Sequence, residues 1–211
     1  MSAHPAQLAP LASRLRRILV HVGPDETCAV RVQAALLHHA LTADLLVVGH
    51  SSAPHAGRAG LGFLEQLLLR CPRPVLVLPG HGSFHHLGTH IVIGWDGGPV
   101  AARAAADAMP LLAAAERVHV CTWHHLHDGV DLSEHLDSVA QWLRCHGVDA
   151  EPRVEPVVGP IGEALCRTAT SLNADLIVMG TYGHSRWVER VVGGATRTAL
   201  LRSPVPLLMS H

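Results

Sequence analysis

The segment from residue 174 to residue 211 reads ADLIVMGTYGHSRWVERVVGGATRTALLRSPVPLLMSH. It opens with the pattern of a buried strand at Leu176–Met179, passes through a glycine-rich turn and reaches a glycine pair at Gly193–Gly194. A helix is expected directly afterwards, at Ala195–Arg202, and a second strand at Val205–Met209. Short apolar runs that alternate with helices are typical of a parallel sheet that is buried on both faces.

The same alternation extends upstream to about residue 90 and predicts a complete, doubly wound α/β domain. Its other strands are expected at Ile91–Trp95, Arg117–Trp123 and Pro152–Val158. Its other helices are expected at Val100–Ala115, from Ser133 to Gly147, and at Gly162–Asn173. The second half of the chain therefore has the five strands and the helices of one whole domain.

The first half repeats part of this design. Residues 43–49 (ADLLVVG) match residues 174–180 (ADLIVMG) at an offset of 131, and residues 71–77 match residues 203–209 at an offset of 132. The opening strand, Ile18–Val22, matches the first strand of the second half at an offset of only 73. The first copy is therefore shorter by the difference of 58 residues, the length of a strand-helix-strand-helix segment.

We predict that the first copy keeps strands one, four and five and lacks strands two and three. Its helices are expected at about Glu26–Leu41 and Leu61–Arg70. The chain would then divide into a truncated half at 15–80, a linker at 81–89 and a complete domain at 90–211.

The fifth strands of the two copies are expected at Val75–Leu78 and Val205–Met209. Unpaired sheet edges invite pairing, and a three-stranded half covers itself poorly. We expect these two strands to pair with each other, either within the chain or across a homodimer.

Composition excludes several classes of function. Sixteen basic side chains balance 17 acidic ones in 211 residues, so no electrostatic footprint for nucleic acid or an anionic membrane is present. Every basic side chain is an arginine, which excludes a Walker-A lysine and Schiff-base chemistry. The five cysteines are widely spaced and form no zinc or redox motif. With no signal-peptide pattern and no apolar run long enough for a membrane span, the sequence predicts a soluble, cytoplasmic protein.

The turns best suited to bind a ligand follow the first and fourth strands of the second half. Asp96–Gly98 follows the first strand, and Gly180–Gly183 follows the fourth. In an open parallel sheet, ligands bind outside the carboxyl ends of the strands where the winding reverses. Gly193–Thr196 precedes a helix, where free N–H groups and the helix dipole favour phosphate. We therefore expect backbone amides between residues 180 and 194 to hold a phosphate.

The spacing G-x2-G-x9-G, together with the rest of the segment from residue 174 to residue 211, resembles the C-terminal signature of the universal stress protein family. GGATR at the glycine turn is similar to the tandem bacterial members, and the resemblance extends through IGWDGG at 93–98 and weakly over 17–80. The resemblance implies a sheet of order 3-2-1-4-5 with ATP or AMP bound between strands one and four. It also implies that Asp96 lies near the base or ribose, that Val120 lies near adenine, and that glycines surround the phosphates. The residues that it implies for cofactor binding are Asp96, Gly97, Val120, Met179, Gly180, Gly183, Gly193, Gly194, Ala195 and Thr196. It implies no metal and no catalytic residue.

The chain departs from the nucleotide-binding pattern of the family at one position. Gly194 stands where that pattern has Ser or Thr, so a hydroxyl bond to phosphate, worth about 1.5–3 kcal/mol, is lost. Thr196, two residues later, is expected to compensate. The first copy departs further, with Gly23 in place of the acid and Ser52 or Ala53 in place of the second glycine. We predict one nucleotide site per chain, in the second half.

Other motifs have plainer explanations. The 18 histidines include runs at His81–His90 and Trp123–His127, but these lie in expected loops without the fixed spacing of a metal site. His184-Ser185 lacks the G-x-S-x-G elbow of a hydrolase. Asp44 and Asp175 precede strands and are expected to cap turns. The glycines of the turn could also serve the turn alone.

Three hypotheses remain open from the sequence. The chain is a nucleotide-binding stress-response module that acts as a sensor or signalling partner, a scaffold of the same family that binds no nucleotide and works by protein contacts, or a weak ATP hydrolase. The last is disfavoured because no catalytic base can be named.

Overall fold

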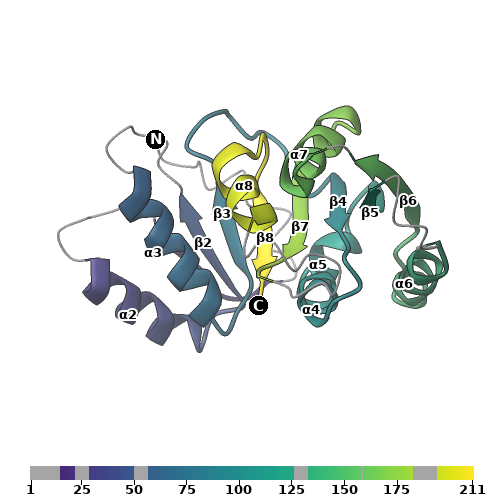
Figure 1. Ribbon diagram of the computed structural model, residues 1–211. Coiled ribbons are helices and arrows are strands. Elements are labelled where there is room, and N and C mark those ends of the chain that lie inside the picture. The colour runs from purple at the N-terminus through teal and green to yellow at the C-terminus, as the bar shows by residue number, and fades with distance from the viewer. Residues whose placement is uncertain (1–14, 22–28, 50–56, 126–132, 158, 183–193) are drawn as a thin grey trace.

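The computed structural model describes residues 15–21, 29–49, 57–125, 133–157, 159–182 and 194–211. These residues form a single eight-stranded sheet with helices on both faces (Figure 1). The strands are β1 (Ile18–His21), β2 (Leu45–Gly49), β3 (Val75–Leu78), β4 (His90–Gly94), β5 (Arg117–His125), β6 (Ala150–Val157), β7 (Leu176–Gly180) and β8 (Leu207–Ser210). The helices are α2 (Ala29–Ala40), α3 (Gly57–Arg70), α4 (Pro99–Asp107), α5 (Met109–Leu112), α6 (Ser133–Cys145), α7 (Ile161–Ser171) and α8 (Gly194–Arg202).

The strands lie in the order β1-β2-β3-β8-β7-β4-β5-β6. All neighbours are parallel except β3 and β8, which run antiparallel with Val75 opposite Met209 and Val77 opposite Leu207. The expected pairing of the two fifth strands is therefore confirmed, and it occurs within one chain. It joins both halves into one continuous sheet.

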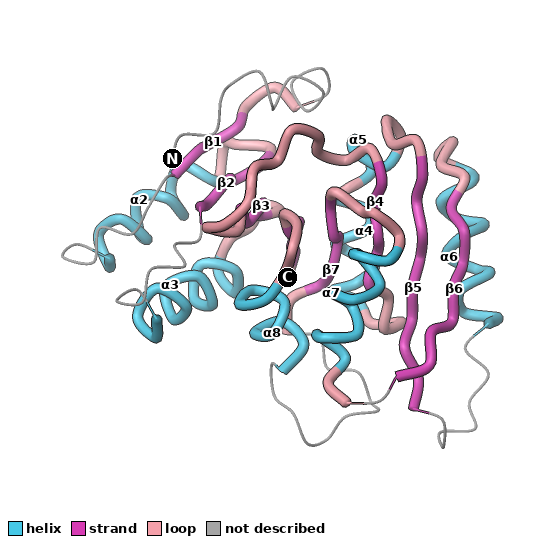
Figure 2. Tube along the Cα trace, turned by 90° about the horizontal axis from the view of Figure 1, so that it is seen from above, coloured by secondary structure: helices cyan, strands magenta, loops and turns pink. Residues whose placement is uncertain are grey.

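Within the second half the winding reverses between β4 and β7. The chain leaves β4 outward through β5 to β6, and then returns to the other side of β4 to form β7 and β8. Helices α4, α5 and α6 cover one face of this part of the sheet, and α7 and α8 cover the other (Figures 1 and 2). The carboxyl ends of β4 and β7 thus flank the point at which a doubly wound sheet opens.

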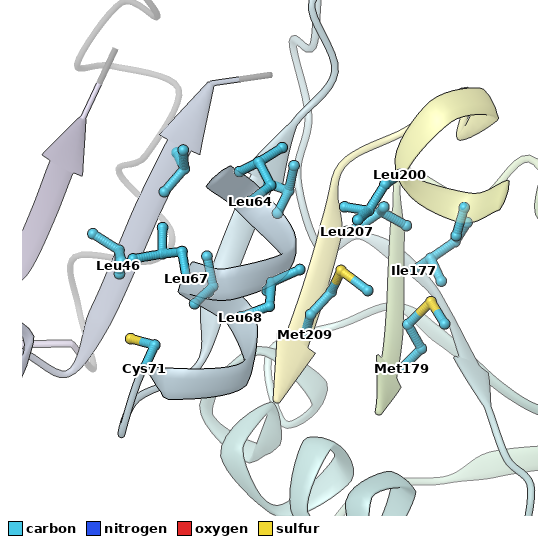
Figure 3. Close-up of a cluster of buried hydrophobic side chains, with 14 of the residues drawn as sticks. Leu46, Leu64, Leu67, Leu68, Cys71, Ile177, Met179, Leu200, Leu207 and Met209 are labelled. Atoms are coloured by element: carbon cyan, nitrogen blue, oxygen red, sulfur yellow. The ribbon is translucent and has the colours of Figure 1, made fainter. Parts of the chain in front are cut away.

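Alternate residues of the strands belong to two separate hydrophobic cores, one on each face of the sheet. Val92, Ile177 and Met209 point to the face covered by α2, α3, α7 and α8, whereas Ile93 and Val178 point to the face covered by α4, α5 and α6. The first core runs across the junction of the halves, because leucines of α3 lie beside β8 and α8 (Figure 3).

The segment between the halves packs against the sheet. In the first half, α2 and α3 cover only one face. On the opposite face the core contains Leu87, with Ile18 and Leu78 packed against it, and no helix of the first half contributes there among the described residues. Leu87, in the expected linker at 81–89, therefore helps to cover this face of the sheet.

One expected helix is wrong in its extent. The sequence predicts a single helix at Val100–Ala115, but α4 ends at Asp107 and a short α5 begins at Met109. Pro110 explains the break because it has no N–H to donate and its ring clashes with the preceding turn. The last strand also begins later than expected, at Leu207, directly after Pro206.

Candidate functional site

The turn after β4 uses Asp96 to hold its own backbone. Trp95 N–H donates to Cys121 O of the neighbouring strand at 2.9 Å, which fixes the end of β4. Asp96 Oδ1 then accepts the N–H of Gly98 at 2.8 Å. Gly97 has a φ of +74°, which favours glycine, and α4 begins directly after this turn. Asp96 itself is exposed at this turn.

Gly180, at the end of β7, lies against the start of α4. A Cβ at this position would lie 2.6 Å from Val100 C and 2.8 Å from Ala101 N, too close for any side chain. This glycine is therefore required by the packing of β7 on α4. The same contact brings the end of β7 beside the turn that contains Asp96.

The next two residues have their backbone donors already engaged. Thr181 N–H donates to Ser210 O at 2.8 Å, and the Thr181 hydroxyl donates to the same oxygen at 3.0 Å. Tyr182 N–H donates to Thr196 Oγ1 at 3.2 Å, while His211 Nδ1 donates to Thr181 O at 3.2 Å. Within the stretch 180–194, the backbone N–H groups of these two residues, neither of which is among the expected ligands, are therefore used inside the protein.

Thr196 bonds the first turn of α8 to the turn after β7. Its side chain is 4% exposed, and its oxygen accepts the Tyr182 N–H. This hydroxyl joins α8 to the turn after β7, and its expected replacement of the hydroxyl missing at position 194 stays a prediction. The first-turn N–H groups of α8, at Gly194, Ala195 and Thr196, have no acceptor within the helix and remain the donors suited to an anion.

Val120 and Met179 lie on opposite faces of the sheet. Val120 is fully buried in the core under α4 and α6, and Met179 is 7% exposed in the core on the other face. Val120 is therefore unavailable to adenine in this structure, and the two side chains cannot line one pocket together. The family resemblance alone implies a place for Val120 beside adenine. In this structure Val120 lies well before the carboxyl end of β5, so it is buried in the sheet.

Gly183 and Gly193 lie outside the described residues, as does the His184-Ser185 pair. The structure thus brings together the turn containing Asp96 and Gly97, the end of β7 at Gly180, and, through the Tyr182–Thr196 bond, the start of α8. Chemically, this arrangement offers backbone N–H groups and one exposed carboxylate at the reversal point of the sheet.

Tyr182 is a feature of the site that the sequence did not single out. Its φ is +52°, unusual for a residue with a side chain. Burial raises the pKa of its phenol to about 12, and the negative charge of Glu65 on α3 acts in the same direction, while Arg197 opposes it. In the spacing G-x2-G-x9-G, Tyr182 occupies one of the positions between Gly180 and Gly183 at which any residue is allowed. No pattern in the sequence links it to Glu65 in the other half.

Titratable groups away from the turns form surface pairs. Arg153 bridges Glu151 and Glu155 at 3.1 and 3.0 Å on β6. His119 Nδ1 lies 3.4 Å from Glu151 Oε2, but burial lowers its pKa against the pull of that carboxylate. Within the described ranges, no group of three or more His, Cys, Asp or Glu side chains is arranged to hold a metal ion. No helix in the same part of the chain is long and apolar enough to cross a membrane.

A family model described as the universal stress protein family matches residues 89–211. The chain belongs to the universal stress protein family. It is 27% identical over 146 residues to the universal stress protein Slr1230 of Synechocystis sp. (strain ATCC 27184 / PCC 6803 / Kazusa), covering 69% of this chain and 49% of that protein. The chain thus spans about half the length of that relative.

Two solved structures share the fold of the chain. A universal stress protein from Archaeoglobus fulgidus DSM 4304 superimposes with a TM-score of 0.66 at 20% identity, over 84% of this chain and 64% of that one. A functionally unknown protein, PA1789 from Pseudomonas aeruginosa PAO1, superimposes with a TM-score of 0.52 at 17% identity, over 92% and 81%. At these identities the likeness concerns the fold alone.

Proposed function

We propose that this universal stress protein binds ATP or AMP at one site per chain, in the half at 90–211, and acts as a sensor or signalling module. The observation that carries the proposal is the start of α8: its first-turn N–H groups have no acceptor within the helix, and Thr196 bonds this turn to the end of β7, next to β4 at the reversal of the sheet. A helix N-terminus at this position favours the charge of a phosphate. Asp96 supplies an exposed carboxylate for a ribose hydroxyl or an amino group of the base.

Substitutions at Gly194 test the phosphate contact directly. Proline is well tolerated at the first position of a helix, so Gly194→Pro should remove one N–H donor without breaking α8. Gly194→Ala keeps the N–H and is the matched control. Gly194→Ser adds the hydroxyl that the family pattern has there.

Calorimetric titration with ATP and AMP should show one site per chain. Loss of a bond to a charged group is worth about 1.5–3 kcal/mol, so we expect Gly194→Pro to weaken binding about tenfold or more. Gly194→Ala should bind as the parent, and Gly194→Ser should bind more tightly. Equal affinity of the proline and alanine variants would refute the assignment of the phosphate to this helix.

A scaffold without nucleotide is the second candidate. It is favoured by the bonds that Thr181 and Tyr182 already make inside the protein, since these leave fewer donors for a ligand. Native mass spectrometry of the purified chain separates the two candidates, because a nucleotide-binding module should carry ATP or AMP whereas a scaffold should not.

We further propose that residues 15–80 are a truncated copy of the domain at 90–211, joined by the segment at 81–89. Two corresponding aspartates support this. Asp44 accepts the N–H groups of Arg16 and Arg17 at 2.9 and 3.0 Å. Asp175, 131 positions later, accepts those of Gly88, Thr89 and His90 at 3.0–3.1 Å. Each carboxylate caps the start of the neighbouring first strand.

The strand registers support the same relationship. Leu46 lies opposite Val75 in the first half, and Ile177 lies opposite Leu207 in the second. Leu46 N–H and Ile177 N–H donate to Pro74 O and Pro206 O, respectively, at 3.1 and 3.0 Å. Strands four and five therefore pair in the same register in both halves, and the hydrogen bond from strand four to the proline before strand five is also the same.

A further inference from the structure

The strand β1 forms one end of the eight-stranded sheet, opposite the end formed by β5 and β6 (Figure 2). Among the described residues it pairs only with β2. The strand that matches it in the second half, β4, pairs with β7 on one side and with β5 on the other. The first half therefore has an open edge at the place where the second half has a neighbouring strand.

The hydrogen bonds at the start of β1 show which residues face this edge. Asp44 N–H donates to Arg17 O at 2.8 Å, so the backbone of Arg17 points toward β2. Backbone N–H and C=O groups alternate in direction along a strand, so Leu19 also points toward β2. The N–H and C=O groups of Ile18 and Val20 point away from β2, into the open edge.

The second half shows what the matching groups bind when a strand is present. Trp95 N–H donates to Cys121 O of β5 at 2.9 Å. Ile91 and Ile93, four and two positions before Trp95, point to the same side by the alternation of the strand. At the offset of 73, these two isoleucines correspond to the two outward residues of β1. The open edge of β1 thus has the donors and acceptors of a strand that lacks one partner.

The side chains of β1 leave this edge without protection. Val20 is 49% exposed, and Ile18, on the same face of the strand, packs at the margin of the core. The sequence of β1, ILVH, contains no proline, arginine, lysine or acidic residue. The other outer strand, β6, has two prolines and three charged side chains. Prolines and charges are the usual protection of an edge against pairing, and β1 has neither.

We propose that β1 joins two copies of this chain, by pairing antiparallel with β1 of a second copy about a twofold axis at Leu19. This register places Val20 of each copy opposite Ile18 of the other, where their outward N–H and C=O groups bond in two symmetric pairs. The β-branched side chains then cover each other across the strands. Arg16 and Arg17 lie at opposite ends of the pairing, which keeps the positive charges of the two copies apart.

The other edge of the sheet explains why association should stop at two copies. Pairing of β1 with β6 of a second copy would be head-to-tail and would continue into a fibre. Pro152 and Pro156 have no N–H to donate, so β6 is a poor partner for β1. The chain already joins two edges in antiparallel fashion where β3 meets β8. The β1 edge is therefore complementary to itself, and this inference does not depend on nucleotide binding.

Hydrogen exchange of the full chain tests the register without any variant. Sedimentation at increasing protein concentration should show an equilibrium between monomer and dimer. The amides of Ile18 and Val20 should exchange more slowly at the high concentration, whereas the Leu19 amide, which faces β2, should be equally protected at both. A chain that stays monomeric would overturn the proposal. A dimer that leaves the exchange of Ile18 and Val20 unchanged would overturn it as well.

Two proline variants then locate the contact. Val20→Pro removes an outward N–H and no bond within the chain. Symmetry deletes two bonds at once, so the dissociation constant of the dimer should rise about tenfold or more. Val154→Pro makes the matched change on β6, and Val20→Thr keeps both the N–H and the branched side chain, so both should dimerise as the parent does.

The remaining outcomes are equally decisive. A Val20→Pro protein that is folded by circular dichroism and dimerises as the parent would refute the assignment to β1. Loss of the dimer in Val154→Pro, or species larger than a dimer in the parent, would show that β6 takes part and would refute the closed pairing. If Val20→Pro does not fold, the exchange of Ile18 and Val20 in the parent decides the question.

Discussion

A side chain at Gly180 would collide with the backbone of α4, whereas the corresponding Gly49, 131 positions earlier, has no described residue within 4 Å of an added Cβ. We expect Gly180→Ala to lower the free energy of unfolding by about 1–3 kcal/mol through overpacking. Gly49→Ala is the matched control and should stay within about 0.5 kcal/mol of the parent. Urea unfolding of the two variants measures the difference. Equal stability would show that α4 can move away from β7.

Cys121 should make the free energy of unfolding of the protein fall at alkaline pH. Burial raises the pKa of this thiol from 9.0 to about 12, so the folded chain keeps a proton that the unfolded chain has released. Its contribution to stability is complete below pH 9 and is lost as the pH rises toward 12. We therefore expect the free energy of unfolding to decrease with pH in this range.

The variant Cys121→Ala should reduce this slope, although its cavity lowers stability at every pH. Cys145 is exposed, so Cys145→Ala should leave the slope unchanged. Cys71 and Cys166 also have raised pKa values and will preserve part of the slope. Urea titrations at about pH 7.5 and pH 10.5 suffice to compare the three proteins. A parent-like slope in Cys121→Ala would contradict the assignment.

At the scale of elements, the pairing of β8 decides how the halves are joined. This strand lies between β7 and β3, with Leu207 opposite both Ile177 and Val77. A proline there removes a donor from a central strand. We expect Leu207→Pro to lower the free energy of unfolding by more than about 2 kcal/mol and to loosen the first half from the second.

Val154→Pro is the control for this substitution. Val154 is on the edge strand β6, which already contains Pro152 and Pro156 at the same alternation, so a further proline should be tolerated. Limited proteolysis between the halves measures the loosening. Equal resistance of the Leu207→Pro and Val154→Pro proteins would mean that the β3–β8 pairing contributes little.

The elements also show which features the sequence could predict. Strands with continuous apolar runs, such as those at 45–49 and 176–180, stand out because both of their faces are buried. The pairing of β3 with β8 follows from unpaired edges. In contrast, the apolar pattern gives no sign of the break at Pro110, because it continues across this residue.

Only the backbone turns of the candidate site could be predicted from the sequence. Turn positions such as Gly97 follow from the local sequence, because their conformation favours glycine. The bond from Tyr182 to Thr196 and the action of Glu65 on Tyr182 join residues far apart in the chain. No periodicity records such contacts, since they depend on how α3 and α8 pack in three dimensions.

On the scale of the whole molecule, the two outer strands are β1 and β6. The edge at β6 is protected by two prolines and by the charged residues Glu151, Arg153 and Glu155. The last strand of the second half has no such protection, and it is covered instead by β3 of the first half. Since this pairing is used within the chain, a homodimer would need a different surface.

A separate chain of residues 89–211 should therefore associate. Without the first half, β8 becomes an open edge, and Leu207 and Met209, each at most 1% exposed in the whole chain, lose the cover of α3. We expect this fragment to dimerise through β8 or to aggregate, as measured by light scattering after size exclusion. Adding residues 1–88 as a second chain should restore a one-to-one complex, because it returns the partner strand and the covering helix together. A fragment that stays monomeric and stable alone would show that the first half is dispensable for packing.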